Sequence, residues 1–406
     1  MKKKFILKAI FVSVCALVIA GCSVCGKGSY RSSNSDFAGE AVKPYIESGE
    51  LPGIISVFCK GKVQETVCAG WADVDKKRPM SMDNLFMQCS QTKGFCGVTV
   101  AMLIEEGKIS LDDPVSKYLP EFKNLKVRVK DKKGKFVTVP AKNTLTVRMV
   151  MNHTGGFGFE IPTKSRNGWT ALSLRDTARE AALQPLRFEP GEKSNYSNTG
   201  IDIGAAIVEV VSGKPWEVFL AERVFAPLGM KNSTFNPTDE QLANSVSLYV
   251  VQKGEKAKYR EFNRAMPLPH NGPTVHPSAG AGLWTTAADQ LKFYKMLMNL
   301  GVGENGVRIL KEETVKSLLA TSTRPEKLGN YSMGLYADFK KGTIGHGGAW
   351  GTSCTVNWRT KELRLKVVQL NGNPRPWDKE ISKAADKFFK MQIDDSDTAA
   401  YTGRLK

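Results

Sequence analysis

The chain has 406 residues, of which 41% are apolar and 24% are charged. A chain of this length and composition buries a large core, and no Pro/Gly-dominated tract or long charge block points to widespread disorder. The formal net charge of +18 favours anionic partners; because the N-terminus predicts export, envelope polymers or lipid headgroups are expected rather than nucleic acid.

Residues 1–21 have the pattern of a lipoprotein signal peptide. Lysines at positions 2, 3, 4 and 8 precede an apolar stretch over 9–20, which is shorter than the roughly 20 residues of a membrane span. The stretch ends in Ala20-Gly21-Cys22, which resembles a bacterial lipobox and predicts that Cys22 carries a lipid. The alternative is an ordinary secretory signal with an incidental cysteine.

A lipid on Cys22 would anchor the protein to a bacterial membrane, facing the periplasm or the exterior of the cell envelope. Residues 22–38 are small and polar and predict a flexible tether with a mean reach of roughly 20–25 Å. The folded domain is expected over 39–392, close to this membrane, and a polar tail over 393–406. Without the four leader lysines the charge of the chain is +14.

Seven cysteines remain after the leader, at positions 22, 25, 59, 68, 89, 96 and 354. Their spacing indicates no disulfide framework, since Cys89 and Cys96 would lie about 10 Å apart on one helix, beyond disulfide reach. We expect free, mostly buried thiols, no metal site and no cofactor.

The first predicted elements after the tether are two strands over 54–59 and 62–71, joined as a hairpin at Lys60-Gly61. A helix is predicted over 90–106, where apolar side chains recur at helical spacing before Gly107. The densest basic region, 123–142, has alternating valines on both sides of Lys133-Gly134 and predicts a protruding hairpin. Its charge either keeps it soluble or binds an anionic partner.

Helical periods continue through the middle of the chain, over 146–151, 175–183, 198–211, 216–224 and 286–298. Strands return over 331–336, 351–358 and 363–371, and a last helix is predicted over 377–390. Strands at both ends with helices between them predict an α/β fold: one antiparallel sheet flanked by helices, with an inserted, mostly helical subdomain.

Ser90-Gln91-Thr92-Lys93 is the first chemical motif and the chain's only Ser-x-x-Lys. Residues i and i+3 share a helix face, so Ser90 Oγ and Lys93 Nζ are expected to meet at the first turn. A serine hydroxyl is a weak nucleophile until a base takes its proton, and a lysine serves as that base only if burial or nearby charge lowers its pKa. The unpaired N–H groups of this turn suit a developing oxyanion.

Tyr196-Ser197-Asn198 is the second motif and the only Tyr-x-Asn in the chain. A phenol relays protons and an Asn amide holds a substrate carbonyl; in isolation the pattern also fits a turn aromatic followed by a helix-capping Asn. The third motif is His346-Gly347-Gly348, whose glycines let a substrate lie against a strand edge. His153-Thr154-Gly155 and His270-Asn271-Gly272 share its spacing, but only His346 is predicted to open a strand.

These three motifs, in this order, resemble the family of class C-type β-lactamases, DD-peptidases and related esterases over roughly residues 40–392. Supporting phrases are TVRMVMNHTGG over 146–156, LGM over 228–230 and PSAGAGLWTT over 277–286. The resemblance implies the fold shared by serine β-lactamases and penicillin-binding proteins.

Acyl transfer is the chemistry that the resemblance implies. Ser90 would attack a carbonyl, Lys93 and Tyr196 would share general-base and general-acid duty, and water would then hydrolyse the acyl-enzyme. The resemblance assigns substrate binding to Asn198, His346, Gly348 and Ala349, with the N–H groups of Ser90 and Ala349 as the oxyanion hole. Which of Lys93 and Tyr196 is the base stays open.

Dedicated β-lactamases with these motifs have Lys where this chain has His346, so the permanent cation for the antibiotic's carboxylate is missing. We therefore expect a serine hydrolase of small-molecule or peptide acyl substrates, an esterase or a D-amino-acid peptidase ahead of a β-lactamase. The alternative of another class is a non-catalytic lipoprotein that binds peptidoglycan or a β-lactam.

Overall fold

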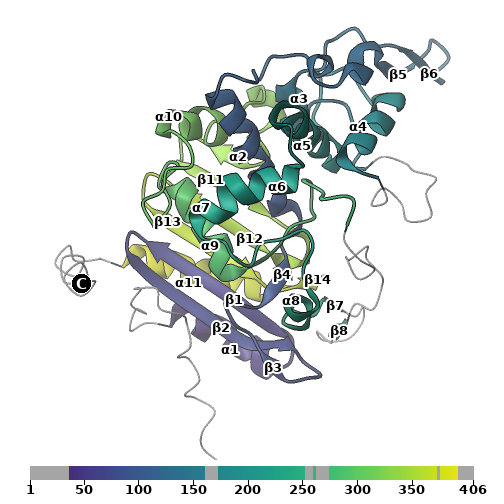
Figure 1. Ribbon diagram of the computed structural model, residues 1–406. Helices are drawn as coiled ribbons and strands as arrows, with labels where there is room; N and C mark the ends of the chain where they lie inside the picture. Colours follow the sequence, from purple (N-terminus) through teal and green to yellow (C-terminus); the bar gives the residue numbers. More distant parts are fainter. Residues whose placement is uncertain (1–35, 161–171, 252–258, 262–273, 373–374, 392–406) are drawn as a thin grey trace, which may run out of the picture.

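The computed structural model describes residues 36–160, 172–251, 259–261, 274–372 and 375–391 (Figure 1). The signal peptide, most of the tether and the polar tail lie outside these ranges, as does the His270 motif. No helix in the described ranges is long and apolar enough to cross a bilayer.

A seven-stranded antiparallel sheet forms the centre of the molecule, in the order β10-β11-β12-β13-β1-β2-β3. Its first hairpin is the predicted one, and β13 pairs with the other edge of β1, with Ile55 opposite Val367. Strands from both ends of the chain therefore share one sheet, as predicted. Their bounds are β1 (Gly53–Lys60), β2 (Val63–Asp73), β3 (Arg78–Pro79), β10 (Tyr336–Asp338), β11 (Thr343–Gly347), β12 (Ser353–Asn357) and β13 (Glu362–Val367).

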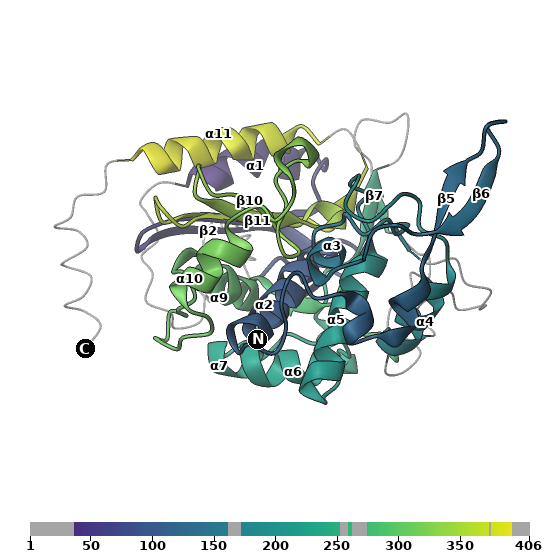
Figure 2. The ribbon, with the colours of Figure 1, turned by 90° about the horizontal axis from the view of Figure 1, so that it is seen from above.

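Two helices, α1 (Phe37–Glu47) and α11 (Trp377–Lys390), lie side by side on one face of the sheet (Figure 2). Trp377 is fully buried between them, with the Tyr45 ring edge-on at 6.1 Å. The helix over 377–390 is confirmed. The sequence analysis missed α1, which begins inside the predicted tether and contains a proline, Pro44.

The other face of the sheet is covered by helices packed around α2 (Thr92–Glu105). Side chains on every side of α2 are buried, and Phe95 stacks on Phe293 of α9 (Ala287–Met298) at 3.6 Å between ring centroids. α5 (Asn198–Ser212) packs beside α2. A helix buried all round can carry a side chain such as Lys93 into the interior of the protein.

Further helices complete the inserted subdomain. Three lie close to predicted positions, α3 (Val147–Met151), α4 (Leu174–Leu183) and α6 (Trp216–Leu220), and three short ones were not predicted, α7 (Ala226–Leu228), α8 (Asp239–Ala243) and α10 (Glu312–Thr314). π-helical turns occupy Ala221–Phe225 and Val315–Leu319, and 3-10 turns Val115–Lys117, Pro120–Asn124 and Glu326–Leu328. The small sheets pair β4 (Leu85–Met87) with β9 (Trp284–Thr286), β5 (Lys126–Lys130) with β6 (Phe136–Pro140), and β7 (Tyr249–Val251) with β8 (Tyr259–Glu261) and β14 (Leu370–Asn371).

Two predicted strands differ from the structure. The prediction of a strand over 331–336 is wrong, because the chain bends at Gly334, which adopts φ +72°. The N–H of Gly334 donates to Met151 O, and β10 begins only at Tyr336. The strand over 363–371 is broken into β13 and β14 next to Gln369, which adopts φ +57°. His346 itself lies near the end of β11, and the motif leads through the turn Ala349–Gly351 into β12, the strand predicted over 351–358.

Candidate active site

Ser90 lies in the 3-10 turn Cys89–Gln91, immediately before α2. The α-helix therefore starts at Thr92, two residues later than expected, because a 3-10 turn forms its first residues. Cys89, just before the serine, has the left-handed φ of +51°, which side chains other than glycine rarely adopt. The structure brings Ser90 Oγ to 3.2 Å from Lys93 Nζ.

Lys93 is fully buried, and its amine has three polar neighbours. Besides Ser90 Oγ, Nζ lies 2.7 Å from Asn198 Oδ1 and 2.6 Å from Gly280 O. Burial lowers the pKa of Lys93 to about 7, and the nearby Asp202 carboxylate opposes this shift. A neutral amine has two N–H donors and one lone pair. The two N–H groups match the two carbonyl oxygens, which leaves the lone pair for the Ser90 hydroxyl.

Tyr196 lies over this amine, with Lys93 Nζ 4.6 Å from the centroid of its ring. Burial raises the pKa of the Tyr196 phenol well above its usual range, although a hydrogen bond with Ser90 opposes the rise. The phenol therefore keeps its proton at neutral pH. Its hydroxyl also lies 3.4 Å from His346 Nε2.

His346 is buried, and its Nδ1 bonds to the carbonyl oxygen of Gly347. A carbonyl only accepts, so the proton of the imidazole is assigned to Nδ1 and Nε2 is the acceptor. That acceptor faces two phenols, Tyr331 at 3.2 Å and Tyr196 at 3.4 Å. Burial, with Lys93 nearby, lowers the pKa of His346 to about 3. The ring is neutral across the physiological range.

Asn198 is the first residue of α5 and faces Lys93. The capping alternative for this asparagine is wrong, because Ser197 is the N-cap and its Oγ accepts the N–H of Gly200 at 3.0 Å. Asn198 Nδ2 donates to Glu160 Oε1 at 3.4 Å. At Gly280 a Cβ would lie 2.8–2.9 Å from the Asn198 side chain, so only glycine allows the close approach of its carbonyl to the lysine.

Gly348 brings the end of β11 against the nucleophile turn. A Cβ at Gly348 would overlap Gln88 O and Thr352 Oγ1. The backbone N–H of Gly348 donates to Thr352 O at 2.8 Å. Ala349 follows as the first residue of the 3-10 turn Ala349–Gly351, which packs against the turn Cys89–Gln91. The backbone of Ala349 thus lies beside the Ser90 turn.

Sequence reasoning missed three side chains around the motif residues. Asp202 follows Asn198 by one turn of α5, and its carboxylate accepts the N–H of Gly280 at 3.0 Å; the i, i+4 spacing could have indicated it. His153 packs between the rings of Tyr196 and Tyr331, with centroids 4.5 and 4.6 Å away. His153 shares the His-x-Gly spacing of the third motif but was set aside because it is not predicted to open a strand, and Tyr331 had no spacing signal that pointed to this cluster.

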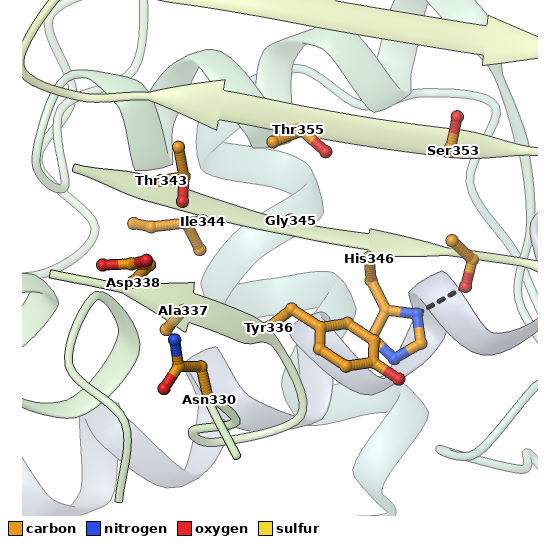
Figure 3. A pocket seen from close by; sticks show the side chains of 11 residues that line it. Asn330, Tyr336, Ala337, Asp338, Thr343, Ile344, Gly345, His346, Ser353 and Thr355 are labelled. Carbon is orange, nitrogen blue, oxygen red and sulfur yellow. Dashed lines mark hydrogen bonds between the residues drawn. The ribbon is translucent and has the colours of Figure 1, made fainter. Parts of the chain in front are cut away.

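A pocket of about 340 Å³ opens along strands β10 to β12, beside His346 (Figure 3). His346 and the half-exposed Tyr336 lie next to each other at this pocket. Ser90 is not among its lining residues, so the pocket adjoins the nucleophile through His346 and Gly347 without containing it.

The described part of the chain contains no cluster of three His, Cys, Asp or Glu side chains that could hold a metal ion. Of its five cysteines, those at 59, 89, 96 and 354 are buried free thiols, and Cys68 is partly buried. Desolvation by burial raises the pKa of the Cys89 thiol to about 12, so this neighbour of Ser90 stays protonated.

Comparison with known proteins places the chain in a family. Residues 39–384 match the Beta-lactamase family. Protein Rv1367c of Mycobacterium tuberculosis is 28% identical over 291 residues, which are 70% of this chain and 71% of that protein. Esterase EstB of Burkholderia gladioli is 27% identical over 272 residues, 61% of this chain and 66% of the esterase.

The fold is also that of a solved enzyme. EstCE1, described as a hydrolase with promiscuous acyltransferase activity, superposes with a TM-score of 0.69 at 22% identity, over 86% of this chain and 97% of that one. The match to the family model covers most of the chain and includes all three motifs. The chain belongs to the Beta-lactamase family and is a serine hydrolase with the fold shared by β-lactamases and penicillin-binding proteins.

Proposed function

We propose that the protein is an esterase that forms an acyl-enzyme on Ser90, with Lys93 as the general base. The environment of Lys93 carries this proposal: the amine is buried, its pKa is lowered to about 7, and its third neighbour is the Ser90 hydroxyl at 3.2 Å. A base whose pKa lies near the working pH combines the correct protonation state with a useful driving force for proton transfer.

In the acylation step, Ser90 Oγ bonds to the ester carbonyl carbon while Lys93 Nζ takes the hydroxyl proton. Tyr196 donates its phenol proton to the departing alkoxide and is reprotonated from Lys93, so the alcohol leaves neutral. Water then attacks the acyl-enzyme with the same groups acting in reverse, which releases the acid and restores Ser90. The high pKa of Tyr196 suits a proton donor rather than a base.

The developing oxyanion would be bound by the backbone N–H groups of Ser90 and Ala349. Support comes from the packing of their two turns against each other and from the N-terminus of α2 beside Ser90. Removing one such donor typically costs about 2.7–4 kcal/mol of transition-state stabilisation.

The uncharged His346 favours esters over substrates that carry a carboxylate. β-Lactams and peptides ending in D-Ala present an anion beside the scissile bond, and a ring with a pKa of about 3 offers it no positive charge. A neutral ester needs no such partner. The relative named esterase EstB supports the same substrate class.

A substrate panel tests this assignment. We expect the purified protein to hydrolyse a p-nitrophenyl ester with turnover that Ser90→Ala abolishes, ahead of a D-Ala-D-Ala peptide and a chromogenic cephalosporin. A fluorescent fluorophosphonate should label the wild type and not Ser90→Ala. Slow acylation by a penicillin probe without turnover of any substrate would instead support the non-catalytic binding lipoprotein.

We further propose that the enzyme works in the cell envelope, anchored through a lipid on Cys22. The basic leader and the Ala20-Gly21-Cys22 sequence support this. Growth of an expressing bacterium with an alkyne fatty acid should label the wild type and leave Cys22→Ser unlabelled. Label on the Cys22→Ser variant, or none on the wild type, would exclude the anchor.

A further inference from the structure

The hairpin of β5 and β6 projects from the helical subdomain, away from the central sheet (Figures 1 and 2). Its register pairs Val127 with Val139 and Val129 with Val137, and Val127 is fully buried against the body of the protein. The residues that alternate with these valines, and those of the turn, carry the charge. Six of them are exposed cations: Lys126, Arg128, Lys130, Lys132, Lys133 and Lys135.

These cations are not neutralised by neighbouring acids. None of the six forms an ion pair with a carboxylate in the described part of the chain. The single carboxylate of the hairpin, Asp131, accepts the backbone N–H groups of Lys133 and Lys135 at 2.8 and 2.9 Å. One acid among six cations leaves the hairpin with a net charge of +5.

Apolar side chains are exposed among the cations. Phe136 is 55% exposed and Val137 39% exposed, and they are the first two residues of β6 after the turn. The Arg128 guanidinium lies 4.1 Å from the centroid of the Phe136 ring. If the cations only kept the hairpin soluble, an exposed aromatic ring beside them would have no use. If the hairpin bound a soluble polyanion, the ring would stay in contact with water.

A membrane surface accommodates both features. Aromatic rings are stable at the boundary between headgroups and acyl chains, and lysines and arginines beside them bind lipid phosphates. We propose that the β5–β6 hairpin docks on an anionic phospholipid bilayer, with Phe136 entering the interface and the six cations on the headgroups. Such docking would orient the domain on the membrane and does not depend on the hydrolase reaction.

Vesicle sedimentation tests the proposal with the full chain carrying Cys22→Ser, which removes the predicted lipid. The hairpin variant combines Lys130→Gln, Lys132→Gln, Lys133→Gln and Lys135→Gln. The matched control makes the same change of charge on exposed residues of α11, with Lys379→Gln, Lys383→Gln, Lys387→Gln and Lys390→Gln. Ester hydrolysis in solution is expected to be equal in all variants and shows that each is folded. Its absence from all of them, the parent with Cys22→Ser included, would bear on the proposed function alone.

We expect binding to phosphatidylcholine vesicles that contain phosphatidylglycerol, and much less to pure phosphatidylcholine. The hairpin variant should lose at least about 100-fold in affinity for anionic vesicles, and the α11 variant should change little. Equal losses in the two variants would overturn the proposal, because net charge alone would then explain the binding.

A third variant separates a bilayer from a soluble polyanion. Phe136→Ser should weaken binding to anionic vesicles about tenfold and leave binding to dextran sulfate unchanged. If Phe136→Ser has no effect on vesicles and dextran sulfate binds as tightly as they do, the hairpin is a polyanion site and the bilayer proposal is wrong.

Discussion

Asp202 acts on Lys93, the proposed base, through both backbone groups of a single residue, Gly280. Its carboxylate holds the Gly280 N–H at 3.0 Å while the Gly280 carbonyl accepts from Lys93 Nζ at 2.6 Å. The same negative charge raises the pKa of Lys93 against the effect of burial. Asp202 is therefore a positioning residue that also tunes the charge of the base.

Asparagine in place of Asp202 removes the negative charge and keeps nearly the same side-chain shape. In Asp202→Asn the pKa of Lys93 should fall, because the neighbouring negative charge that stabilises the ammonium form is gone. Lys93 acts deprotonated, so the acid limb of kcat/KM for a neutral ester should move to lower pH. The measurement is a pH–rate profile of both proteins.

Ser278→Ala is the control for this prediction. It removes a hydroxyl that bonds to Asp202 at 3.2 Å and to the Gly280 N–H at 3.2 Å, and it leaves the charge in place. Its acid limb should stay where the wild type has it. If both variants lower the rate and neither shifts the acid limb of the pH–rate profile, Asp202 holds the backbone around Gly280 in place and does not set the pKa of Lys93.

Tyr196→Phe separates the proton donor from the base. Loss of the phenol should lower kcat by about 10²–10⁴-fold, the usual worth of a general acid. The acid limb should remain near pH 7, because the pKa that sets it belongs to Lys93. A profile without that limb in Tyr196→Phe would assign the base to the tyrosine.

The sequence could indicate Ser90, Lys93 and Tyr196 because each stands in a motif that occurs once in the chain. It left the choice of base open, since our proposal of Lys93 rests on the pKa shifts that burial causes, and burial follows only from the packed structure. His153 and Tyr331 meet the site through contacts between segments far apart in the chain, and local spacing carries no trace of them.

At the scale of elements, the junction of β11 with the Ser90 turn depends on two adjacent glycines in different surroundings. A Cβ at Gly348 would overlap Gln88 O and Thr352 Oγ1, whereas the nearest atom to one at Gly347 is Thr352 O at 3.8 Å. Gly348→Ala should displace Ala349 and lower kcat about 100-fold, the usual cost of a misplacement near 1 Å. Steady-state ester hydrolysis measures the change.

Gly347→Ala is the matched variant of the same junction. Its methyl group would make only an ordinary van der Waals contact with Thr352 O, so its kcat should stay within a few-fold of the wild type. Equal losses in the two variants would show that the close approach of Gly348 to the nucleophile turn does not set the site.

Helices were predicted closely because their apolar spacing is local, as in α5 and α11. The prediction of a strand over 331–336 was wrong because alternation of apolar residues also fits a bend. The glycine of this bend, Gly334, lies so close to the backbone of Lys93 that a Cβ would overlap Lys93 O. The hairpin of β5 and β6 was predicted from its valines, and its register confirms the pairing.

At the scale of the whole molecule, α1 and α11, the first and last described helices, form a layer on one face of the sheet. Trp377 is fully buried there, so Trp377→Ala should lower the free energy of unfolding by about 3–5 kcal/mol. Urea denaturation measures this loss. The 74%-exposed Leu183 provides a control: Leu183→Ala should change the free energy by less than about 0.5 kcal/mol.

A larger loss of stability in Leu183→Ala than in Trp377→Ala would contradict the observed packing of α1 and α11.

The antiparallel sheet built from both ends could be predicted from strands at 54–71 and beyond 350. The helix α1 could not, because its 11 residues include a proline and follow a polar segment.

The proposed mechanism depends on a lysine that is neutral near pH 7 and takes the proton of Ser90. The most direct test is the rate of acyl-enzyme formation, measured as the burst of p-nitrophenol from a neutral ester across pH. The proposed mechanism predicts that the rate of acyl-enzyme formation rises with pH through a midpoint of about 7. It also predicts that the burst disappears in Lys93→Ala. A burst rate that is flat across this range, or a limb that persists in Lys93→Ala, would contradict it.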